Sequence, residues 1–382
     1  MKPTAAEEPV MLLDVKDLHI EFRTRDGVAR AVNGVDYSVE AGRTLAVLGE
    51  SGSGKSVTAQ AVMGILDTPP GRITRGEIRF QGRDLLTMGE AERRAIRGPG
   101  MAMIFQDALS ALNPVLSVGD QLGEMFIVHR GARRKEARER AVDLMERVGI
   151  PGAAERVRQY PHQFSGGMRQ RIMIAMALAL EPALIIADEP TTALDVTVQA
   201  QVMELLAELQ RELGMGLILI THDLGVVADV ADRIAVMYAG RIVETAPVHD
   251  IYRAPAHPYT RGLLRSIPRL DQKGRELYAI KGLPPNLLAI PPGCAFHPRC
   301  PLARDICRTE EPPLYDVAPG RASACHFWRE TLELGAGTGD GPGDRPVEGQ
   351  GEGPQGGPQG GPGDGRSGAG ERPGGAGERS DG

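Results

Sequence analysis

The residues most suited to chemistry form a glycine-rich loop that ends in lysine and serine. Its sequence fits the pattern G-x-x-x-x-G-K-[ST], in which backbone N–H groups wrap phosphate oxygens. Lys55 is expected to reach the β- and γ-phosphates of a nucleotide, and Ser56 to offer its hydroxyl to Mg²⁺. By itself this P-loop predicts only a nucleoside triphosphate site, in which the nucleotide-binding residues are Gly49, Glu50, Ser51, Gly52, Ser53, Gly54, Lys55 and Ser56.

The alternative interpretation of this loop is a glycine-rich turn that matches by chance. Glycine is common in the chain, with 49 residues, but lysine is scarce, so a random match has a probability of about 1%. The flanking residues reduce the probability of a chance match further, because the pattern predicts a buried strand at residues 44–48 and a helix at residues 57–66. Strand, loop and helix is the order that a phosphate site requires, since the helix N-terminus adds partial positive charge.

Two adjacent carboxylates follow a second apolar run, at residues 183–187. Asp188 is expected to help hold Mg²⁺, through water, and Glu189 to orient or deprotonate the attacking water. The alternative is a solvated strand end. A third apolar run at 216–220 and an amphipathic helix at 198–213 predict a parallel sheet, because such runs are typical of strands buried on both faces.

A further segment, Phe164 to Met168, resembles the LSGGQ signature of ABC ATPases, with Phe and Met at its ends. No other class of P-loop protein pairs these two motifs, and the resemblance covers about Val10 to Ala254. In that family the signature of one cassette completes the ATP site of another. The resemblance therefore implies a second ABC ATPase subunit, as a homodimer or heterodimer, whose γ-phosphate is bound by Ser165, Gly166 and Gly167.

The resemblance also assigns roles to single residues. Gln106 matches the Q-loop glutamine, which touches Mg²⁺ and the lytic water, and His222 matches the histidine that contacts the γ-phosphate and steadies the catalytic glutamate. Asp195 lies in a segment that resembles the D-loop. Phe22 is the candidate for stacking on adenine, with an ordinary core residue as the alternative. Metal ligation by His222 is not expected, because no second ligand lies at a suitable spacing.

Three segments resemble the oligopeptide and dipeptide importers within that family: residues 106–121, 257–264 and 292–301. This resemblance implies an ATPase that powers the import of di- or oligopeptides through two membrane permeases, with an extracytoplasmic binding protein that delivers the peptide. Nickel or other small solutes remain alternatives because they share the subfamily. A soluble ABC ATPase is less favoured, since the chain has neither paired cassettes nor a long coiled-coil insertion, and a P-loop kinase would lack the signature.

The family implies an α/β fold: a RecA-like P-loop core with an antiparallel β subdomain, a helical subdomain and a small C-terminal extension. We expect an ATPase domain at 10–254, the extension with its cysteines at 255–333 and a disordered Gly/Pro-rich tail at 334–382. A net charge of −6 does not suggest a nucleic-acid partner. The longest apolar run, 172–180, is too short to span a bilayer, so we expect peripheral attachment to the cytoplasmic side of the membrane.

The four cysteines of the chain lie in one stretch of this extension. A cytoplasmic location argues against disulfides, so metal ligation is the leading functional interpretation. The spacing lacks paired C-x₂-C knuckles, and four thiolates suit a [4Fe–4S] cluster, to which the resemblance also points. Zinc, with His297 and His326 as spare ligands, and free thiols remain the alternatives. Nothing in the sequence places the segment near the ATP site, so a structural or sensing role is expected for Cys294, Cys300, Cys307 and Cys325.

Overall fold

The computed structural model describes residues 11–192, 194–267 and 278–336. The chain divides into two units, residues 1–339 and 340–382, and the second lies outside the described residues. The tail expected at 334–382 is therefore outside them too, apart from the end of the last helix, α13 (Trp328–Ala336).

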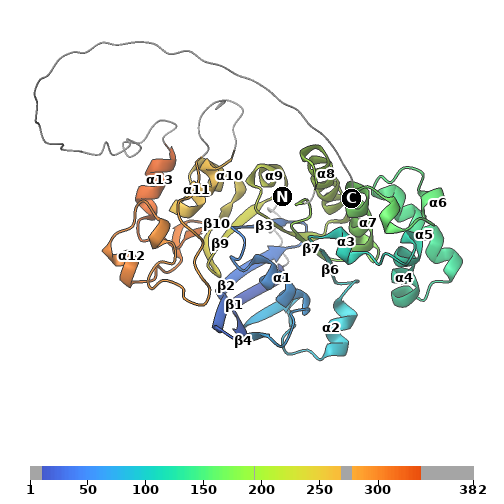
Figure 1. The fold of residues 1–382 in the computed structure, drawn as a ribbon, viewed down its shortest axis with the longest axis horizontal. Coiled ribbons are helices and arrows are strands. Elements are labelled where there is room, and N and C mark those ends of the chain that lie inside the picture. The colour runs from blue at the N-terminus through green and yellow to red at the C-terminus, as the bar shows by residue number, and fades with distance from the viewer. Residues whose placement is uncertain (1–10, 193, 268–277, 337–382) are drawn as a thin grey trace, which may run out of the picture. The chain divides into compact units, whose positions relative to one another are not determined.

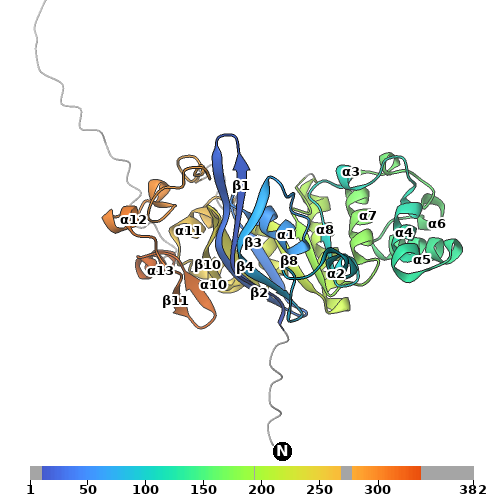
Figure 2. The same ribbon diagram turned by 90° about the horizontal axis from the view of Figure 1, so that it is seen from below.

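A small antiparallel sheet opens the described chain, as expected. Its strand order is β2-β1-β4-β5, and Figure 2 shows the two long strands lying side by side. Apolar side chains on one face of these strands are buried, because β1 packs Leu13, Val15, Leu18 and Ile20 into the core. The strands are β1 (Met11–Thr24), β2 (Gly27–Glu40), β4 (Gly71–Phe80) and β5 (Arg83–Asp84).

The second sheet has eight strands in the order β11-β12-β10-β9-β3-β8-β7-β6. Its central strands are parallel, and three of them match the predicted apolar runs. Because the carboxyl ends of parallel strands share one edge, the residues that follow these strands can meet there. The parallel strands are β3 (Thr44–Leu48), β6 (Met101–Ile104), β7 (Leu184–Asp188), β8 (Gly216–Thr221) and β9 (Arg233–Tyr238).

Local sequence sets the ends of the two helices next to the predicted site. The first, α1 (Lys55–Met63), begins earlier than predicted because Gly54 precedes it in the left-handed region, and it ends at Gly64, also left-handed. The helix α8 (Val196–Leu213) likewise begins earlier than predicted, because the Asp195 carboxylate accepts the N–H groups of Thr197 and Val198.

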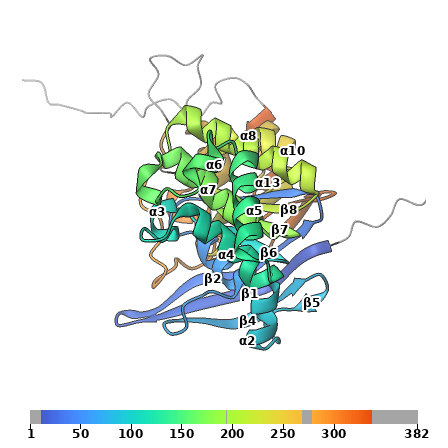
Figure 3. The same ribbon diagram turned by 90° about the vertical axis from the view of Figure 1, so that its right-hand side faces the viewer.

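A group of helices forms the subdomain predicted between Gln106 and Phe164, drawn in green in Figures 1 and 3. The apolar stripe of α5 is buried as expected, with Ala137, Ala141, Leu144 and Met145 in the core. The helices are α3 (Ala108–Ala111), α4 (Val118–Arg130), α5 (Arg134–Arg147), α6 (Ala153–Arg156) and the 3₁₀ turn η1 (Pro161–Gln163), and they are followed by α7 (Gly166–Leu178).

The C-terminal extension continues the large sheet. The antiparallel strand β12 pairs with β10, and β11 pairs with β12. This proline-rich region is therefore held by backbone hydrogen bonds to the main sheet. Its elements are β10 (Arg241–Pro247), α11 (Pro258–Arg265), η2 (His297–Arg299), α12 (Asp305–Thr309), β11 (Tyr315–Ala318), β12 (Arg321–Ser323) and α13. The remaining helices are α2 (Glu90–Ile96), α9 (Leu224–Val230) and α10 (Val248–Arg253). Within the described ranges, every helix is too short or too polar to cross a membrane.

Candidate active site

The glycine-rich loop connects β3 to α1 at the carboxyl edge of the parallel strands. Two of its glycines cannot carry a side chain, because backbone from other strands lies against them. A Cβ on Gly49 would stand 2.3 Å from the carbonyl oxygen of Met237, and one on Gly54 would stand 2.4 Å from that of Ala31. Both glycines also have positive φ angles, 154° and 104°. The loop is therefore fixed closely between β2 and β9.

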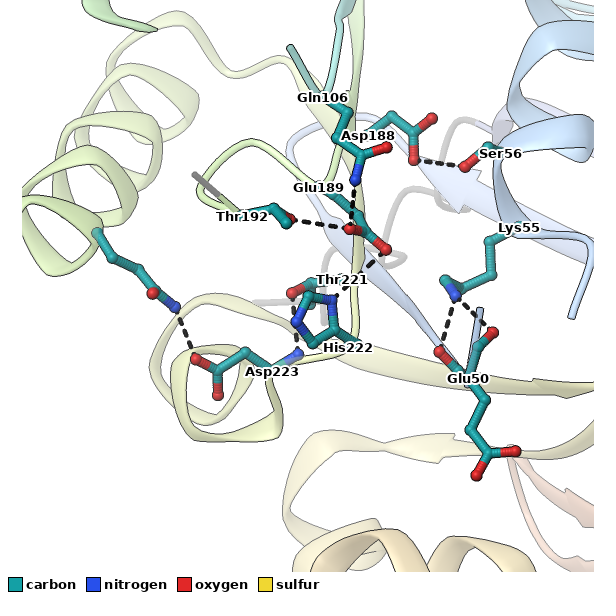
Figure 4. A network of polar contacts seen from close by, with 12 residues as sticks. Glu50, Lys55, Ser56, Gln106, Asp188, Glu189, Thr192, Thr221, His222 and Asp223 are labelled. Atoms are coloured by element: carbon teal, nitrogen blue, oxygen red, sulfur yellow. Dashed lines mark hydrogen bonds and ion pairs between the residues drawn. The ribbon is translucent and has the colours of Figure 1, made fainter. Parts of the chain in front are cut away.

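Lys55 turns its ammonium group back into this loop. Its Nζ donates to the carbonyl oxygens of Gly49 at 2.7 Å and Glu50 at 3.0 Å (Figure 4). Burial lowers the pKa of Lys55, and the nearby carboxylates of Glu189, Asp188 and Glu50 oppose that shift. A buried cation surrounded by loop N–H groups is suited to bind phosphate oxygens.

Asp188 and Ser56 lie together at the end of β7. The Ser56 hydroxyl donates to Asp188 Oδ1 at 2.9 Å, and the carboxylate is only 6% exposed. Burial raises the pKa of Asp188, while the Ser56 hydrogen bond lowers it. A hydroxyl beside a carboxylate is an all-oxygen donor set of the kind that Mg²⁺ prefers, so these two residues fit the metal expected here.

Three residues meet at Glu189: Gln106 and His222, which follow the neighbouring strands β6 and β8, and Thr192, three residues further along the same loop. The Glu189 Oε2 atom accepts from Gln106 Nε2 at 3.0 Å and from the Thr192 hydroxyl at 2.8 Å. His222 Nδ1 lies 3.5 Å from the other oxygen of Glu189. Glu189 has a φ of 46° and donates its N–H to the Ile220 carbonyl, which directs the side chain out of the sheet edge. Figure 4 shows this carboxylate between Gln106 and His222.

Thr192 is a member of this cluster that the sequence did not single out. It lies in the expected D-loop segment, but a threonine hydroxyl after a strand carries no pattern of its own. A second hydrogen-bonded group holds the segment of His222: Asp223 accepts from Gln199 Nε2 at 2.6 Å, and its N–H donates to the Thr221 hydroxyl at 3.1 Å. Only the folded contacts identify these positioning groups.

The signature residues lie on another surface. The Ser165 hydroxyl caps α7 by accepting the Met168 N–H at 3.4 Å, and both Ser165 and Gly166 are exposed. Gly167 packs against α8, where a Cβ would stand 2.5 Å from Val198 Cγ1. In the part of the chain that the structure describes, no hydrogen bond or ion pair joins the signature to the P-loop. The signature thus stands apart from the loop of its own chain.

Phe22 lies on β1 opposite Gly71 of β4. Its side chain is half-buried and packs against the apolar core that the small sheet shares with α1. These contacts agree with both the adenine-stacking hypothesis and the core alternative, and the stacking role stays a prediction.

The four cysteines are gathered around one small cavity, together with His297 and His326. None forms a disulfide. Burial raises the pKa of Cys300 to about 12 and that of Cys325 to about 11. Among the described residues, however, no three His, Cys, Asp or Glu side chains are arranged to hold a metal ion. The structure therefore gives neither a zinc site nor an iron–sulfur site directly.

The expectation that nothing places this segment near the ATP site is wrong. Arg299, the residue before Cys300, donates from Nη1 to Glu50 Oε2 at 2.6 Å and from Nη2 to Glu50 Oε1 at 2.9 Å. Glu50 belongs to the P-loop. The two residues are 249 positions apart, so no local pattern could have linked them.

Comparison with protein families gives two matches. Residues 32–192 match the model of the ABC transporter family, and residues 243–307 match the model described as the oligopeptide/dipeptide transporter C-terminal region. The second match begins within the antiparallel strand β10 and includes three of the four cysteines, in a region that the sequence had assigned mostly to an importer-type extension.

Several proteins and structures resemble the chain over most of their length. It is 52% identical to the oligopeptide transport ATP-binding protein OppD of Salmonella typhimurium, over 84% of this chain and 96% of that protein. It is 54% identical to the dipeptide transport ATP-binding protein DppD of Bacillus subtilis, over 78% of this chain and 88% of that protein. Among solved structures, the ATP-binding cassette MJ0796, a dimer bound to ADP and Pi, matches with a TM-score of 0.56 at 27% identity, covering 62% of this chain and 99% of that one.

Proposed function

The chain belongs to the ABC transporter family, among the ATP-binding subunits of oligopeptide and dipeptide transporters, and we propose that it hydrolyses ATP to power peptide import through partner permeases. The observation that carries the ATPase is the carboxylate of Glu189, held beside His222 at the edge that also presents Lys55. The names of the relatives favour peptides over nickel or other small solutes. They also favour a transporter over a soluble ABC ATPase.

When ATP binds, Lys55 would exchange its hydrogen-bond acceptors in the P-loop for phosphate oxygens. Lys55 leaves the carbonyl oxygens of Gly49 and Glu50 and binds the β- and γ-phosphates, while the loop N–H groups wrap the remaining oxygens. Ser56 and Asp188, with Gln106, would hold Mg²⁺, which when bound neutralises charge on the phosphates.

Hydrolysis then depends on the orientation of Glu189. Its carboxylate would orient or deprotonate the water that attacks the γ-phosphate, and a base must be held within hydrogen-bonding reach of that water. Gln106 and Thr192 both donate to one oxygen, which leaves the other directed toward His222 and the expected γ-phosphate position. His222, which is 57% exposed, is free to turn toward that phosphate.

A second cassette, identical or related, would complete the site. Ser165 and Gly166 are exposed at the N-terminus of α7, where helix N–H groups favour an anion. Beyond Asp195 the apolar Val196 is 83% exposed. These surfaces support a role in binding the ATP of a partner, with Asp195 at the contact between the cassettes. Adenine would stack on Phe22.

An apolar cavity supports contact with a permease. It has a volume of about 230 Å³ and is lined mostly by methionine and alanine, including Met101, Met125 and Met173. Phe105 is part of its wall and 43% exposed, and Val115, in the segment after the Q-loop, is 76% exposed. Flexible methionines suit a groove that accepts an apolar helix. We expect two permeases, an extracytoplasmic peptide-binding protein and a peripheral position on the cytoplasmic face.

Uptake of labelled peptides tests this function. A strain that lacks the gene should lose uptake of dipeptides or oligopeptides, and the wild-type gene should restore it. The Glu189→Gln gene serves as the matched control, because it should yield a folded subunit without restoring uptake. Restored uptake of nickel but not of any peptide would contradict the peptide assignment and support the small-solute alternative.

The cysteines have a separate proposed role, as ligands of a [4Fe–4S] cluster. The observation in favour is that all four thiols line one cavity. Two of them come from separate elements and are buried: Cys307 lies in α12, and Cys325 follows β12. Four thiolates suit the corners of a cubane cluster. Zinc, with His297 and His326 as spare ligands, is the alternative.

Anaerobic purification tests the cluster. The protein should be brown and contain about four irons per chain. A Cys300→Ser variant should lose the colour and the iron. A colourless protein that contains zinc, or no metal, after anaerobic handling would exclude the cluster.

A further inference from the structure

The cysteine segment and the P-loop are joined by a partly buried, bidentate ion pair. Both terminal nitrogens of Arg299 donate to the Glu50 carboxylate, at 2.6 and 2.9 Å, and the Arg299 side chain is only 5% exposed. A planar guanidinium that binds both oxygens of a carboxylate fixes its orientation as well as its charge. The carboxylate on the P-loop is therefore held by a residue from outside the cassette core.

The position of Arg299 is itself fixed from several sides. Its Nε donates to the Lys281 carbonyl at 3.1 Å, and its backbone N–H donates to the Phe296 carbonyl at 3.0 Å. The Phe296 ring packs against Tyr238 and Tyr259, with ring centroids 5.2 and 5.3 Å apart. Arg299 is thus part of a rigid group rather than a surface side chain that happens to reach the loop.

The same group also holds the backbone of the P-loop. The Glu50 N–H donates to the Tyr259 hydroxyl at 2.9 Å, and Tyr259 is fully buried. The Glu50 carbonyl in turn accepts from Lys55. One P-loop residue therefore has its side chain, its N–H group and its carbonyl all engaged, the first two by residues beyond β9.

The negative charge of Glu50 should affect how tightly the P-loop binds ATP. The P-loop is proposed to bind the phosphates of a highly charged anion. The Glu50 carboxylate is directed away from Lys55 (Figure 4), but it still raises the pKa of Lys55 and so acts on charges in the loop. Like charges in a partly buried site repel one another more than in water, because solvent screens them less. A guanidinium paired with Glu50 cancels the repulsion, whereas an unpaired Glu50 would oppose the phosphates.

We propose that Arg299 is a positioning residue of the ATP site: it neutralises Glu50 and fixes the P-loop, so that ATP affinity depends on the C-terminal extension. The inference rests on the proposed function, because it requires that the P-loop binds ATP. It assigns to the extension a direct role in nucleotide binding.

The test is ATP affinity of the full chain, measured by titration with a fluorescent ATP analogue in the presence of Mg²⁺. Arg299→Gln should weaken binding about tenfold, because it leaves the Glu50 charge unpaired. Glu50→Gln should bind ATP more tightly than Arg299→Gln does, since it removes the opposing charge. Arg299→Lys should lose less affinity than Arg299→Gln, because it keeps the charge although it cannot bind both carboxylate oxygens in the same way.

Two controls separate this role from simple stabilisation. Arg304→Gln removes an exposed ion pair with Glu330 in the same extension and should leave affinity unchanged. The Glu50→Gln/Arg299→Gln double variant should recover the affinity that Arg299→Gln loses, which general damage to the fold would not allow. If Arg299→Gln fails to fold, the double variant is compared with Glu50→Gln instead: equal affinities support an action of Arg299 through Glu50, and weaker binding by the double variant contradicts it.

The outcomes distinguish the two proposals. Equal losses of affinity in Glu50→Gln and Arg299→Gln, or no loss in Arg299→Gln, would overturn the positioning role while the ATPase stands. A wild-type chain that binds no ATP would overturn the proposed function itself.

Discussion

At the scale of single residues, the active site depends on how one carboxylate is held. Glu189 has a strained positive φ and takes two hydrogen bonds on one oxygen, from Gln106 and Thr192. Strain of this kind persists only where surrounding contacts maintain it, and it is common at catalytic centres. The two adjacent carboxylates therefore have different partners, because Asp188 accepts a hydrogen bond from Ser56 instead.

Replacing Glu189 by Gln should reduce the rate of ATP hydrolysis by about two to four orders of magnitude, because only the group that activates water is lost. Affinity for ATP should stay near that of the wild type, since the P-loop is unchanged. Steady-state phosphate release and ATP titration measure the two quantities. Turnover within a few-fold of the wild type would remove Glu189 from the catalytic role.

Lys55→Ala, in contrast, should weaken ATP binding itself. It removes the buried ammonium that binds the phosphates, and a charge-assisted contact of this kind corresponds to roughly a 10- to 100-fold loss of ATP affinity. The same titration measures it. Lys135→Ala, on an exposed helix face, is the matched control and should bind ATP normally. Unchanged affinity in Lys55→Ala would contradict the P-loop assignment.

At the scale of elements, the sequence predicted most of what lies near the site. Strands β3, β7 and β8 were predicted because buried parallel strands are continuous apolar runs, and each run is followed by residues with a proposed role in ATP binding or hydrolysis. The ends of α1 and α8 were missed by a few residues, since Gly54 and Asp195 act as caps only in the folded geometry. Thr192 was missed for the same reason: its role depends on where Glu189 turns.

The packing of α7 on α8 leads to a prediction at this scale. Gly167→Ala should destabilise the protein by roughly 1–3 kcal/mol, because the new Cβ would stand 2.5 Å from Val198 Cγ1. Adding Val198→Ala should recover part of this loss in urea-induced unfolding, since it removes the overlapping methyl group. ATPase activity should stay low in the double variant, because the proposed close approach of a partner's phosphate to Gly167 is still blocked.

At the scale of the whole described unit, the extension is built into the cassette rather than appended to it. The hairpin of β11 and β12 continues the main sheet, and Arg299 reaches the P-loop. The sequence could not predict either contact, because short antiparallel strands and a single arginine carry no long-range signal. The importer-type motifs identified the extension, but its contact with the ATP site follows only from the fold.

A buried carboxylate at this junction gives the last prediction. Glu244 of β10 is fully buried and accepts the N–H groups of Ala256, at 2.6 Å, and His257, at 2.9 Å. Its charged neighbour is Arg321 of β12, whose Nη2 lies 3.7 Å from Glu244 Oε1. Burial raises the pKa of Glu244 to about 7, against the hydrogen bonds that lower it.

Because this pKa is higher in the folded than in the unfolded chain, the protonated form of Glu244 stabilises the fold. That contribution is complete below about pH 4.5 and is lost as the pH rises through about 7. Its size is roughly 3 kcal/mol. His257, whose pKa burial lowers to about 3, acts in the opposite direction, since its stability is lost as the pH falls below about 6.5.

Below pH 6.5 the opposite effect of His257 offsets this loss. The free energy of unfolding, measured in urea between pH 6.5 and 8.5, should therefore decrease by roughly 1 kcal/mol as the pH rises, which is the part of the Glu244 contribution that remains at pH 6.5. Glu244→Gln keeps an acceptor oxygen for the two N–H groups but cannot ionise, so its unfolding free energy should change much less over this range. Glu330→Gln, an exposed carboxylate of the same extension, should keep the wild-type slope. A wild-type slope in Glu244→Gln as well would mean that another group titrates, and that the contacts with Ala256, His257 and Arg321 keep Glu244 ionised throughout.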